Sequence, residues 1–204
     1  DDHLICETDA VVLANANGVK NVKQTAWLAV EAVRGQVSYL PATTRSQRIH
    51  TPICYDGYIL PERAGQHVMG ATFKPGQDSI DVNVPEHEEN LAQLEHWLPD
   101  IATVSAASLQ GRAALRAVTP DRMPLVGAVV DVERFKNTYA DLQKGKSASQ
   151  YSPAPCYAGL YVNVGHGARG LTSCFLSADL IAAQLNNEPL PLSRRVQYAL
   201  NPAR

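Results

Sequence analysis

Three glycines near the end of the chain are spaced so that their backbone could hold a ligand. The segment NVGHGARGLTS places them at positions 165, 167 and 170, between an apolar run that ends at Val164 and an amphipathic stretch that ends at Leu185. Glycine reaches backbone angles that other residues avoid and lets a ligand approach the main chain closely. The first amides of a helix have no partner within the helix and carry partial positive charge. The segment therefore predicts a strand, a tight loop and a helix N-terminus.

The ligand of such a loop is not decided by its spacing. It could be a phosphate or the electron-rich pyrimidine edge of a flavin, and a tight connection without any ligand is a third alternative. The dinucleotide fingerprint also requires an early strand–helix–strand unit and an acidic residue about 20 positions further on, after a second strand. Glu188 lies near that distance, but in a Pro-rich tail with no strand before it. A loop for a nucleotide diphosphate is therefore not indicated.

The composition is that of an ordinary soluble globular protein, with 45% hydrophobic and 19% charged residues. A net charge of −2 gives no overall attraction to nucleic acid or to an anionic membrane. No stretch reaches the roughly 18 apolar residues of a membrane span. The four cysteines form no CxxC pair, so a zinc site is not indicated. We therefore predict a cytoplasmic protein that binds no metal and no membrane.

The elements that would position the loop come in a recognisable order. A continuous apolar run at 9–18 is typical of a buried strand in a parallel sheet. The stretches 33–43 and 55–76 read as strands with turns at 62–65 and 75–76, and within the second stretch 55–61 and 65–73 have the half-buried pattern of an antiparallel sheet. The segment 84–98 predicts a helix, because Leu91, Leu94 and Leu98 share one face and Pro99 stops it.

Two more strands are expected near 108–118 and 125–130, followed by a polar connection over 133–159. The last helix is expected to bury one apolar stripe, formed by Leu171, Cys174, Phe175, Ala178, Ile181 and Leu185. This order predicts an α/β (α+β) fold in which a β-rich domain is inserted between two pieces of an α/β domain. The predicted boundaries are 1–33, 34–130 and 131–204.

Several segments resemble the D-amino-acid oxidase/glycine oxidase family. GLYVNVGHGARGLTSCFLSADLIAAQL is similar to its C-terminal flavin segment, and AVVLANANG to its VVxAxG strand. VRGQVSYL resembles the entry to its substrate domain, and GYILPERAGQHVMGATFKPG and ALRAVTPDRMPLVG resemble core segments of that domain. The resemblance implies an FAD-dependent oxidoreductase with a β-rich substrate domain inserted into a Rossmann-like FAD-binding domain. The family's opening GxGxxG does not precede VVLANANG. We therefore expect a piece of a longer polypeptide that lacks the N-terminal portion of the FAD-binding domain, binds FAD poorly by itself and is inactive alone.

Within this family, GHGARGLTS, TPDRMPLVG and NNEPLPLSRRVQYALNPAR resemble the oxidoreductase half of bifunctional tRNA-modifying enzymes. The resemblance implies oxidation of a CH–NH bond in 5-carboxymethylaminomethyl-(2-thio)uridine at the tRNA wobble position. The products would be 5-aminomethyl-(2-thio)uridine and glyoxylate, and a methyltransferase domain in the same polypeptide would then use S-adenosylmethionine. Two alternatives remain open, a glycine- or sarcosine-type small-amine oxidase and a non-enzymatic β-rich binding module.

The resemblance also implies which residues bind. Arg116 matches the family's carboxylate-binding arginine and Tyr58 a substrate-side aromatic, although a structural ion pair and a core tyrosine are the competing interpretations. His166 is expected to be structural rather than a proton donor. Arg34 and Gln36 are expected at the domain junction, and the basic Arg194, Arg195 and Arg204 near the C-terminus are not assigned to RNA contacts. The expected flavin contacts are Gly165, His166, Gly167, Ala168, Arg169, Gly170, Leu171 and Ala14.

Overall fold

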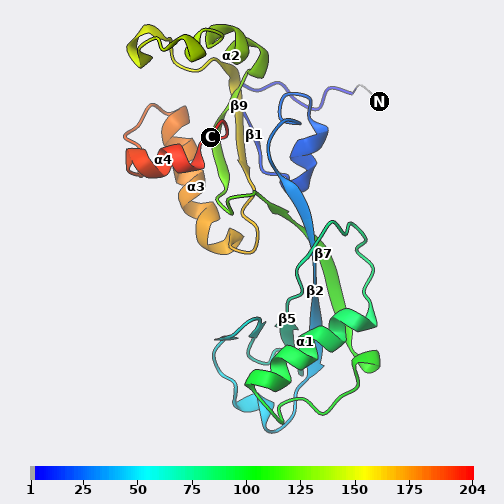
Figure 1. Ribbon diagram of the computed structural model, residues 1–204. Coiled ribbons are helices and arrows are strands. Elements are labelled where there is room, and N and C mark those ends of the chain that lie inside the picture. The colour runs from blue at the N-terminus through cyan, green and yellow to red at the C-terminus, as the bar shows by residue number, and fades with distance from the viewer. Residues whose placement is uncertain (1–2) are drawn as a thin grey trace. The chain divides into compact units, whose positions relative to one another are not determined.

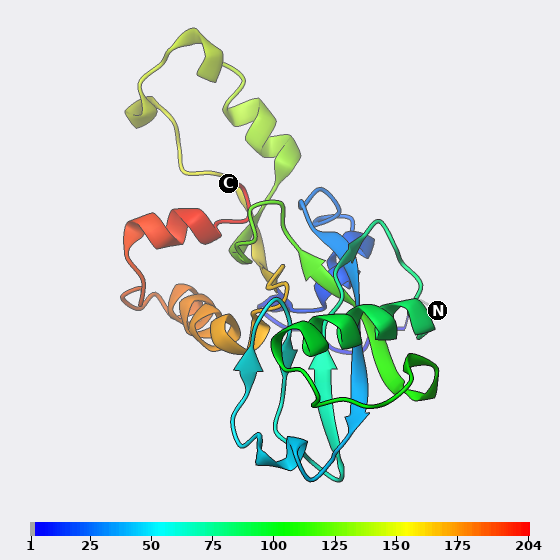
Figure 2. The same cartoon turned by 60° about the horizontal axis from the view of Figure 1, so that its bottom comes forward.

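The computed structural model describes residues 3–204 (Figures 1 and 2). Residues 1 and 2, which belong to the predicted segment 1–33, lie outside the described residues. The chain forms two compact units. Unit 1 contains the described part of 1–31 together with 117–204, and unit 2 contains 32–116. The interruption of one unit by the other agrees with the predicted insertion, and the mixed α/β class is confirmed.

Unit 1 is built on a three-stranded sheet in the order β1-β9-β8. Its strands are β1 (Val11–Leu13), β8 (Leu125–Val130) and β9 (Cys156–Val164). β1 runs parallel to β9, as the continuous apolar pattern predicted, whereas β8 is antiparallel to β9. The predicted burial of β1 is wrong, because Val11 and Val12 are 45% and 42% exposed on this edge strand of the sheet. The predicted strand 9–18 is shorter than expected, because Ala16 has a φ of 52° and the 3₁₀ helix η1 (Ala16–Asn21) begins there.

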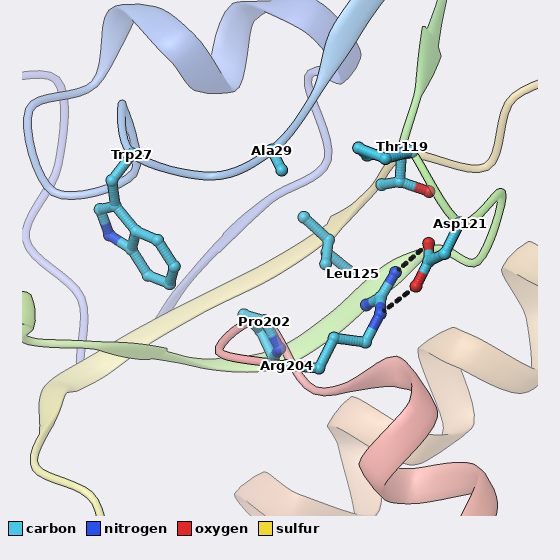
Figure 3. Close-up of a pocket in the computed structure, with 8 residues that line it drawn as sticks. Trp27, Ala29, Thr119, Asp121, Leu125, Pro202 and Arg204 are labelled. Carbon is cyan, nitrogen blue, oxygen red and sulfur yellow. Dashed lines mark hydrogen bonds and ion pairs between the residues drawn. The ribbon is translucent and has the colours of Figure 1, made fainter. Parts of the chain in front are cut away.

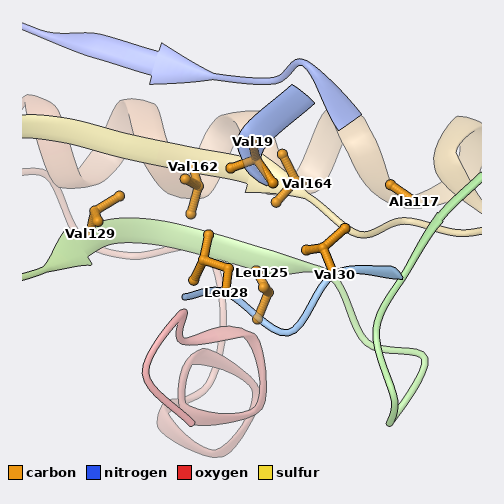
Figure 4. Close-up of a cluster of buried hydrophobic side chains, with 8 residues drawn as sticks. All are labelled: Val19, Leu28, Val30, Ala117, Leu125, Val129, Val162 and Val164. Carbon is orange, nitrogen blue, oxygen red and sulfur yellow. The ribbon is translucent and has the colours of Figure 1, made fainter. Parts of the chain in front are cut away.

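Side chains alternate along the strands of unit 1 and so form a core on each face of the sheet. One cluster includes Leu125, Val129 and Val162 from the sheet and Val19 and Leu28 from the preceding chain (Figure 4). The other joins Val126 to residues of α3 (Gly170–Leu185) and α4 (Arg194–Leu200). The helices therefore cover one face of the sheet, and η1 with the segment that follows it covers the other.

The apolar stripe predicted for the last helix is wrong along most of its length, because Ala178 and Leu185 are exposed and Ile181 is its one buried member. Leu171 is 88% exposed and Phe175 is 73% exposed, whereas Leu180 and Ile181 are buried. Periodicity cannot select the buried face of this helix because apolar residues occur on more than one side of it. Tertiary contacts with β8 and α4 select the face that contains Leu180 and Ile181.

Unit 2 contains a second sheet in the order β3-β4-β5-β2-β6, with β7 also paired to β2. Its strands are β2 (Glu31–Pro41), β3 (Ile53–Cys54), β4 (Tyr58–Ile59), β5 (Gln66–Gly70), β6 (Lys74–Pro75) and β7 (Gln110–Val118). The pairs of β2 with β5 and of β4 with β5 are antiparallel, as the alternating pattern predicted. The helix α1 (Val84–Trp97) lies across this sheet (Figure 2).

Helix α1 confirms its prediction closely. The Asn83 side chain accepts a hydrogen bond from the Glu86 amide at 3.0 Å, which caps the helix, and Pro85 occupies its first turn. Leu94 is fully buried, and Leu91 and Leu98 are partly buried against the same cluster. The apolar face thus fixes α1 on the sheet.

Two features differ from the sequence-based expectations. The predicted domain boundary followed Val130, but β8 pairs with β9 and unit 2 ends at Arg116. The polar connection contains the helix α2 (Val132–Thr138), whose N-cap Asp131 accepts from the Arg134 amide. The remaining short 3₁₀ helices are η2 (Ser46–Arg48), η3 (Ala106–Ser108), η4 (Leu142–Lys144) and η5 (Ala148–Gln150). Among the described residues no helix is both long and apolar enough to cross a membrane.

Candidate functional site

In unit 1 the parallel strands β1 and β9 end at the same edge of the sheet. Leu13 is paired with Val162, so the chain leaves β1 at Ala14 and leaves β9 at Gly165 beside each other. In open α/β sheets, ligands bind outside the carboxyl ends of parallel strands. The structure therefore brings Ala14 and the glycine loop, which are far apart in the sequence, to the edge where a ligand site is expected.

The loop itself is held by its main chain and by close packing. Gly165 and Gly167 have φ values of 78° and 56°, in the left-handed region that glycine tolerates. The Gly167 amide donates to the Ala117 carbonyl at 2.9 Å. A Cβ at Gly165 would lie 2.7 Å from the Thr119 methyl group. Both the backbone angle and the packing therefore require glycine at position 165.

A Gly165→Ala variant is expected to lower the free energy of unfolding of unit 1 by about 2 kcal/mol, because alanine is strained at positive φ and meets Thr119. Gly145→Ala is the matched control. Gly145 also lies in unit 1 with a φ of 73°, but its Cβ would meet no atom within 4 Å. Urea unfolding monitored by Trp27 fluorescence, in a Trp97→Phe background, measures both. Equal losses in the two variants would show that Thr119 contributes nothing.

His166 belongs to the packing of the loop. Its Nδ1 lies 2.7 Å from Ser173 Oγ and its Nε2 lies 2.8 Å from Asn163 Oδ1. Burial lowers the pKa of His166 below its ordinary value, so the ring is neutral near pH 7. Both ring nitrogens have partners inside unit 1. This geometry agrees with a structural role rather than proton donation.

The N-terminus of α3 presents free backbone donors. The Arg169 carbonyl accepts from the amides of Thr172 and Ser173, at 3.1 and 3.2 Å. The preceding amides of Gly170 and Leu171 have no acceptor one turn earlier in the helix, and no side chain caps the helix at Arg169. Leu171 is exposed beside them. An uncapped, open row of N–H groups suits an electron-rich or anionic edge, so these residues fit the flavin edge expected from the sequence.

Ala14, Ala168 and Arg169 are also exposed at this edge of unit 1, whereas Gly165 is buried. The predicted cofactor residues thus divide into two groups. Gly165 and His166 shape the loop from within, and the others line its accessible surface.

A cavity of about 390 Å³ lies elsewhere in unit 1, with Trp27 on one side and the ion pair of Asp121 and Arg204 on the other (Figure 3). Arg204 Nε and Nη2 donate to the two Asp121 carboxylate oxygens at 2.7 and 2.8 Å. Hydrogen bonding to Arg204 holds the pKa of Asp121 well below its usual range. The positive charge of Arg204 is therefore neutralised by Asp121 of the same chain. Of the three basic residues noted near the C-terminus, Arg194 and Arg195 remain.

In unit 2 the structure brings the two predicted substrate residues together. Burial raises the pKa of Tyr58 above its ordinary value, and the nearby positive charge of Arg116 opposes that rise. Arg116 is half-buried, and Nη1 of its guanidinium donates to the Thr72 carbonyl at 3.1 Å. Within the described residues it forms no ion pair with a carboxylate. The remaining donors of Arg116 suit an external carboxylate.

The opposite face of the same sheet carries a buried polar network. Arg34 Nε donates to Glu86 Oε1 at 2.7 Å, and Glu86 Oε2 accepts from the Thr72 hydroxyl. Gln36 Nε2 donates to the Asn83 carbonyl at 2.8 Å. Burial works to raise the pKa of Glu86, but the hydrogen bonds from Thr72, Arg34 and Asn83 outweigh it, and the pKa is lowered.

Sequence reasoning did not find all of this network. It noted Arg34 and Gln36 but placed them at a domain junction, whereas both are buried inside unit 2. It included Glu86 in the predicted helix 84–98 without giving it a partner, and it gave no role to Thr72. The one feature of the sequence that could have indicated the network was Glu86 in the first turn of the helix, because a charged residue on the buried side of a helix requires a partner. In the described part of the chain, no cluster of three or more His, Cys, Asp or Glu could hold a metal ion.

A family model described as FAD dependent oxidoreductase (DAO) matches residues 2–184. The chain belongs to this family. The resemblance stated from the sequence is confirmed, and the cofactor of the family is FAD. The fit of the loop and helix N-terminus of unit 1 to a flavin edge rests on the geometry of their backbone donors.

Two curated relatives are the tRNA 5-methylaminomethyl-2-thiouridine biosynthesis bifunctional proteins MnmC of Stutzerimonas stutzeri (strain A1501) and Pseudomonas fluorescens (strain Pf0-1). Each is 42% identical to this chain, over 98% and 100% of its length respectively. The chain spans only 31% and 32% of these relatives, about a third of their length.

Among solved structures, glycine oxidase from Geobacillus kaustophilus matches with a TM-score of 0.71, 20% identity and coverage of 97% of this chain and 46% of that chain. Iminodiacetate oxidase from Chelativorans sp. BNC1 matches with a TM-score of 0.68 and 19% identity, over 97% of this chain and 47% of that chain. At this level of identity the likeness supports the fold.

Proposed function

We propose that the chain contributes to an FAD-dependent oxidoreductase that removes the carboxymethyl group from 5-carboxymethylaminomethyl-(2-thio)uridine at the wobble position of tRNA. The observation that carries the proposal is the half-buried guanidinium of Arg116, close to Tyr58 and without a carboxylate partner among the described residues. The relatives named for tRNA 5-methylaminomethyl-2-thiouridine biosynthesis supply the choice of substrate.

The proposed reaction oxidises the carbon between an amine and a carboxylate. Bound FAD supplies the acceptor for the hydride that leaves this methylene. The C–N single bond of the substrate becomes an imine as the amine loses a proton, and water then cleaves the imine to the aminomethyl-uridine and glyoxylate. Glycine and iminodiacetate, named for the two structural neighbours, have the same arrangement of amine, methylene and carboxylate. A common clamp for the carboxylate therefore suits all three compounds.

Arg116 is assigned to that clamp. A guanidinium remains charged at any physiological pH and pairs with a planar carboxylate through two parallel hydrogen bonds. The charge of the guanidinium acts on Tyr58, whose protonated hydroxyl provides a neutral donor on the same face of the sheet. Together they would fix the methylene of the substrate in one orientation, which is the main contribution a protein makes to such a reaction.

In unit 1, the amides at the start of α3 and the open loop residues Ala168 and Arg169 would hold the flavin, and Ala14 would border it at the end of β1. Arg169 would add a positive charge that favours the reduced, anionic cofactor. A complete protein of this type would also contain a methyltransferase domain that uses S-adenosylmethionine and would act on tRNA in the cytoplasm. Arg194 and Arg195 are exposed, but neither is assigned to a contact with tRNA phosphates.

The test is an assay of glyoxylate release by the full-length natural polypeptide that contains this chain. The expected result is FAD-dependent glyoxylate from tRNA that carries 5-carboxymethylaminomethyl-uridine, and little from free glycine or sarcosine. Glyoxylate from the free amino acids but none from the tRNA would replace the proposal with a small-amine oxidase. A purified protein that neither contains nor takes up FAD would contradict both and support a binding module.

A further inference from the structure

The guanidinium of Arg116 lies directly over a glycine of the neighbouring strand. A Cβ built on Gly35 would overlap with Nη1, Cζ and Nη2 of Arg116. Gly35 has ordinary backbone angles, so glycine is not required there by a turn or by strain. The structure therefore uses the missing side chain at this position for one purpose, which is to make room for the arginine head group.

Strand alternation places this arrangement on the face of the sheet away from α1. Arg34, Gln36 and Ser38 point toward α1, where they bond to Glu86, Asn83 and His87 respectively. Gly35 and Val37 therefore face the other side.

Tyr58 shares that side. It is paired with Gly70, and Gly70 is paired with Val37. Directly paired residues project from the same face of a sheet. Arg116 and Tyr58 thus stand over strand positions that include two glycines, Gly35 and Gly70, so the space between them is not filled by side chains from those positions.

Thr72 connects the two faces. Its hydroxyl donates to Glu86 in the buried network, and the same oxygen accepts from the Gln36 amide at 2.9 Å. Its amide donates to the Gln36 carbonyl at 3.2 Å, and its carbonyl accepts from Arg116 at 3.1 Å. Thr72 is 1% exposed, so the bonds of its hydroxyl to Glu86 and Gln36 are shielded from water. The position of the Thr72 carbonyl, which accepts from Arg116, is therefore set by the buried Arg34–Glu86 pair on the other face of the sheet.

We propose that Gly35 and Thr72 are positioning residues for Arg116: Gly35 provides the space in which the guanidinium lies, and the Thr72 carbonyl holds one edge of it. The proposal rests on the proposed role of Arg116 as the carboxylate clamp. A guanidinium held in this way keeps its other donors in a fixed plane, and less conformational entropy is lost when a carboxylate binds. Two residues that never touch the substrate would thus determine how tightly its carboxylate is bound.

The first experiment measures the arginine itself, with the chain in solution and no ligand. The ¹⁵Nε–H NMR signal of Arg116, assigned by its loss in Arg116→Ala, is expected to be distinct from that of exposed Arg112. Gly35→Ala is expected to move the Arg116 signal to the position typical of exposed arginines without unfolding unit 2, because the displaced group is the end of a flexible side chain. Thr72→Val should move it in the same direction, and Thr72→Ser, which retains the hydroxyl, should restore it. Gly76→Ala is the control, since Gly76 lies in unit 2 and its Cβ would meet nothing within 4 Å.

The second experiment titrates the same variants with sarcosine and with its uncharged analogue N-methylglycinamide. Gly35→Ala is expected to weaken sarcosine binding about tenfold, with no effect on the amide, because one charge-assisted hydrogen bond is misplaced. In an Arg116→Ala background, Gly35→Ala should cause no further loss, since it acts only through the arginine.

The outcomes separate the two proposals. An Arg116 signal that Gly35→Ala leaves unchanged, or an equal loss of sarcosine binding with and without Arg116, would overturn the positioning role. A signal that moves as expected in a protein that does not distinguish sarcosine from the amide would support the positioning of Arg116 and contradict the proposed carboxylate clamp.

Discussion

Replacing Arg34 with alanine is expected to lower the free energy of unfolding of unit 2 by about 3–5 kcal/mol, because it leaves a buried carboxylate without its ionic partner. Glu86 is 4% exposed and would retain only its bonds to Thr72 and Asn83. Arg34 also donates to the Asp81 carbonyl at 2.6 Å and to the Ser79 carbonyl, so the loop before α1 would lose its anchor. Chemical unfolding monitored by Trp97, in a Trp27→Phe background, reports on unit 2.

The control is another arginine–carboxylate pair of the same unit. Arg45 and Asp100 lie 3.3 Å apart, but their side chains are 60% and 75% exposed. Arg45→Ala should therefore cost at most about 1 kcal/mol. Equal losses for Arg34→Ala and Arg45→Ala would show that burial of the Arg34–Glu86 pair adds nothing to its effect.

Replacing Arg116 with alanine should raise the half-saturation concentration for the carboxymethylated substrate about 100-fold in the full-length protein, since two charge-assisted hydrogen bonds are lost. Arg116→Lys should recover part of the affinity, because it retains the charge but not the planar pair of donors. The flavin absorbance of each variant should equal that of the unaltered protein. Steady-state kinetics and absorbance of the purified variants measure both quantities.

Arg112 supplies the control for this prediction. It lies four residues earlier on β7, projects to the same face and is exposed. Arg112→Ala should leave both the half-saturation concentration and the flavin absorbance unchanged. If Arg116→Ala loses flavin and substrate binding in equal measure, Arg116 is a structural residue and the proposed clamp is wrong.

Local patterns in the sequence predicted individual elements well. The spacing of Leu91 and Leu94 and the stop at Pro99 predict α1 and its C-terminal end, because both signals act within a few residues of the helix they describe, whereas the cap at Asn83 was found only in the structure. The glycines at 165 and 167 likewise predict a loop with positive φ between β9 and α3. Such features depend on backbone angles and neighbouring side chains, which the local sequence specifies.

Predictions that required knowledge of distant contacts were less successful. Leu171 and Phe175 have the spacing of a buried stripe, yet the packing of α3 against β8 buries a different face. The sequence assigned the strand 125–130 to the β-rich domain 34–130, but this strand pairs with β9 of unit 1. The spacing of apolar residues along a helix or strand indicates that one of its faces is apolar. Whether that face is buried depends on which other element packs against it.

The residues of the candidate site show the same division. The sequence by itself determined the glycine loop, the helix α1, the apolar strands and, through its resemblance, the family and the candidates Arg116 and Tyr58. Only the tertiary structure decided that Ala14 lies beside the loop, that Glu86 pairs with Arg34, and that Gly35 makes room for Arg116. The physical reason is distance along the chain: hydrogen bonds and ion pairs act over a few ångströms in space, whereas Arg34 and Glu86 are 52 positions apart and no local sequence signal indicates the fold that brings them together.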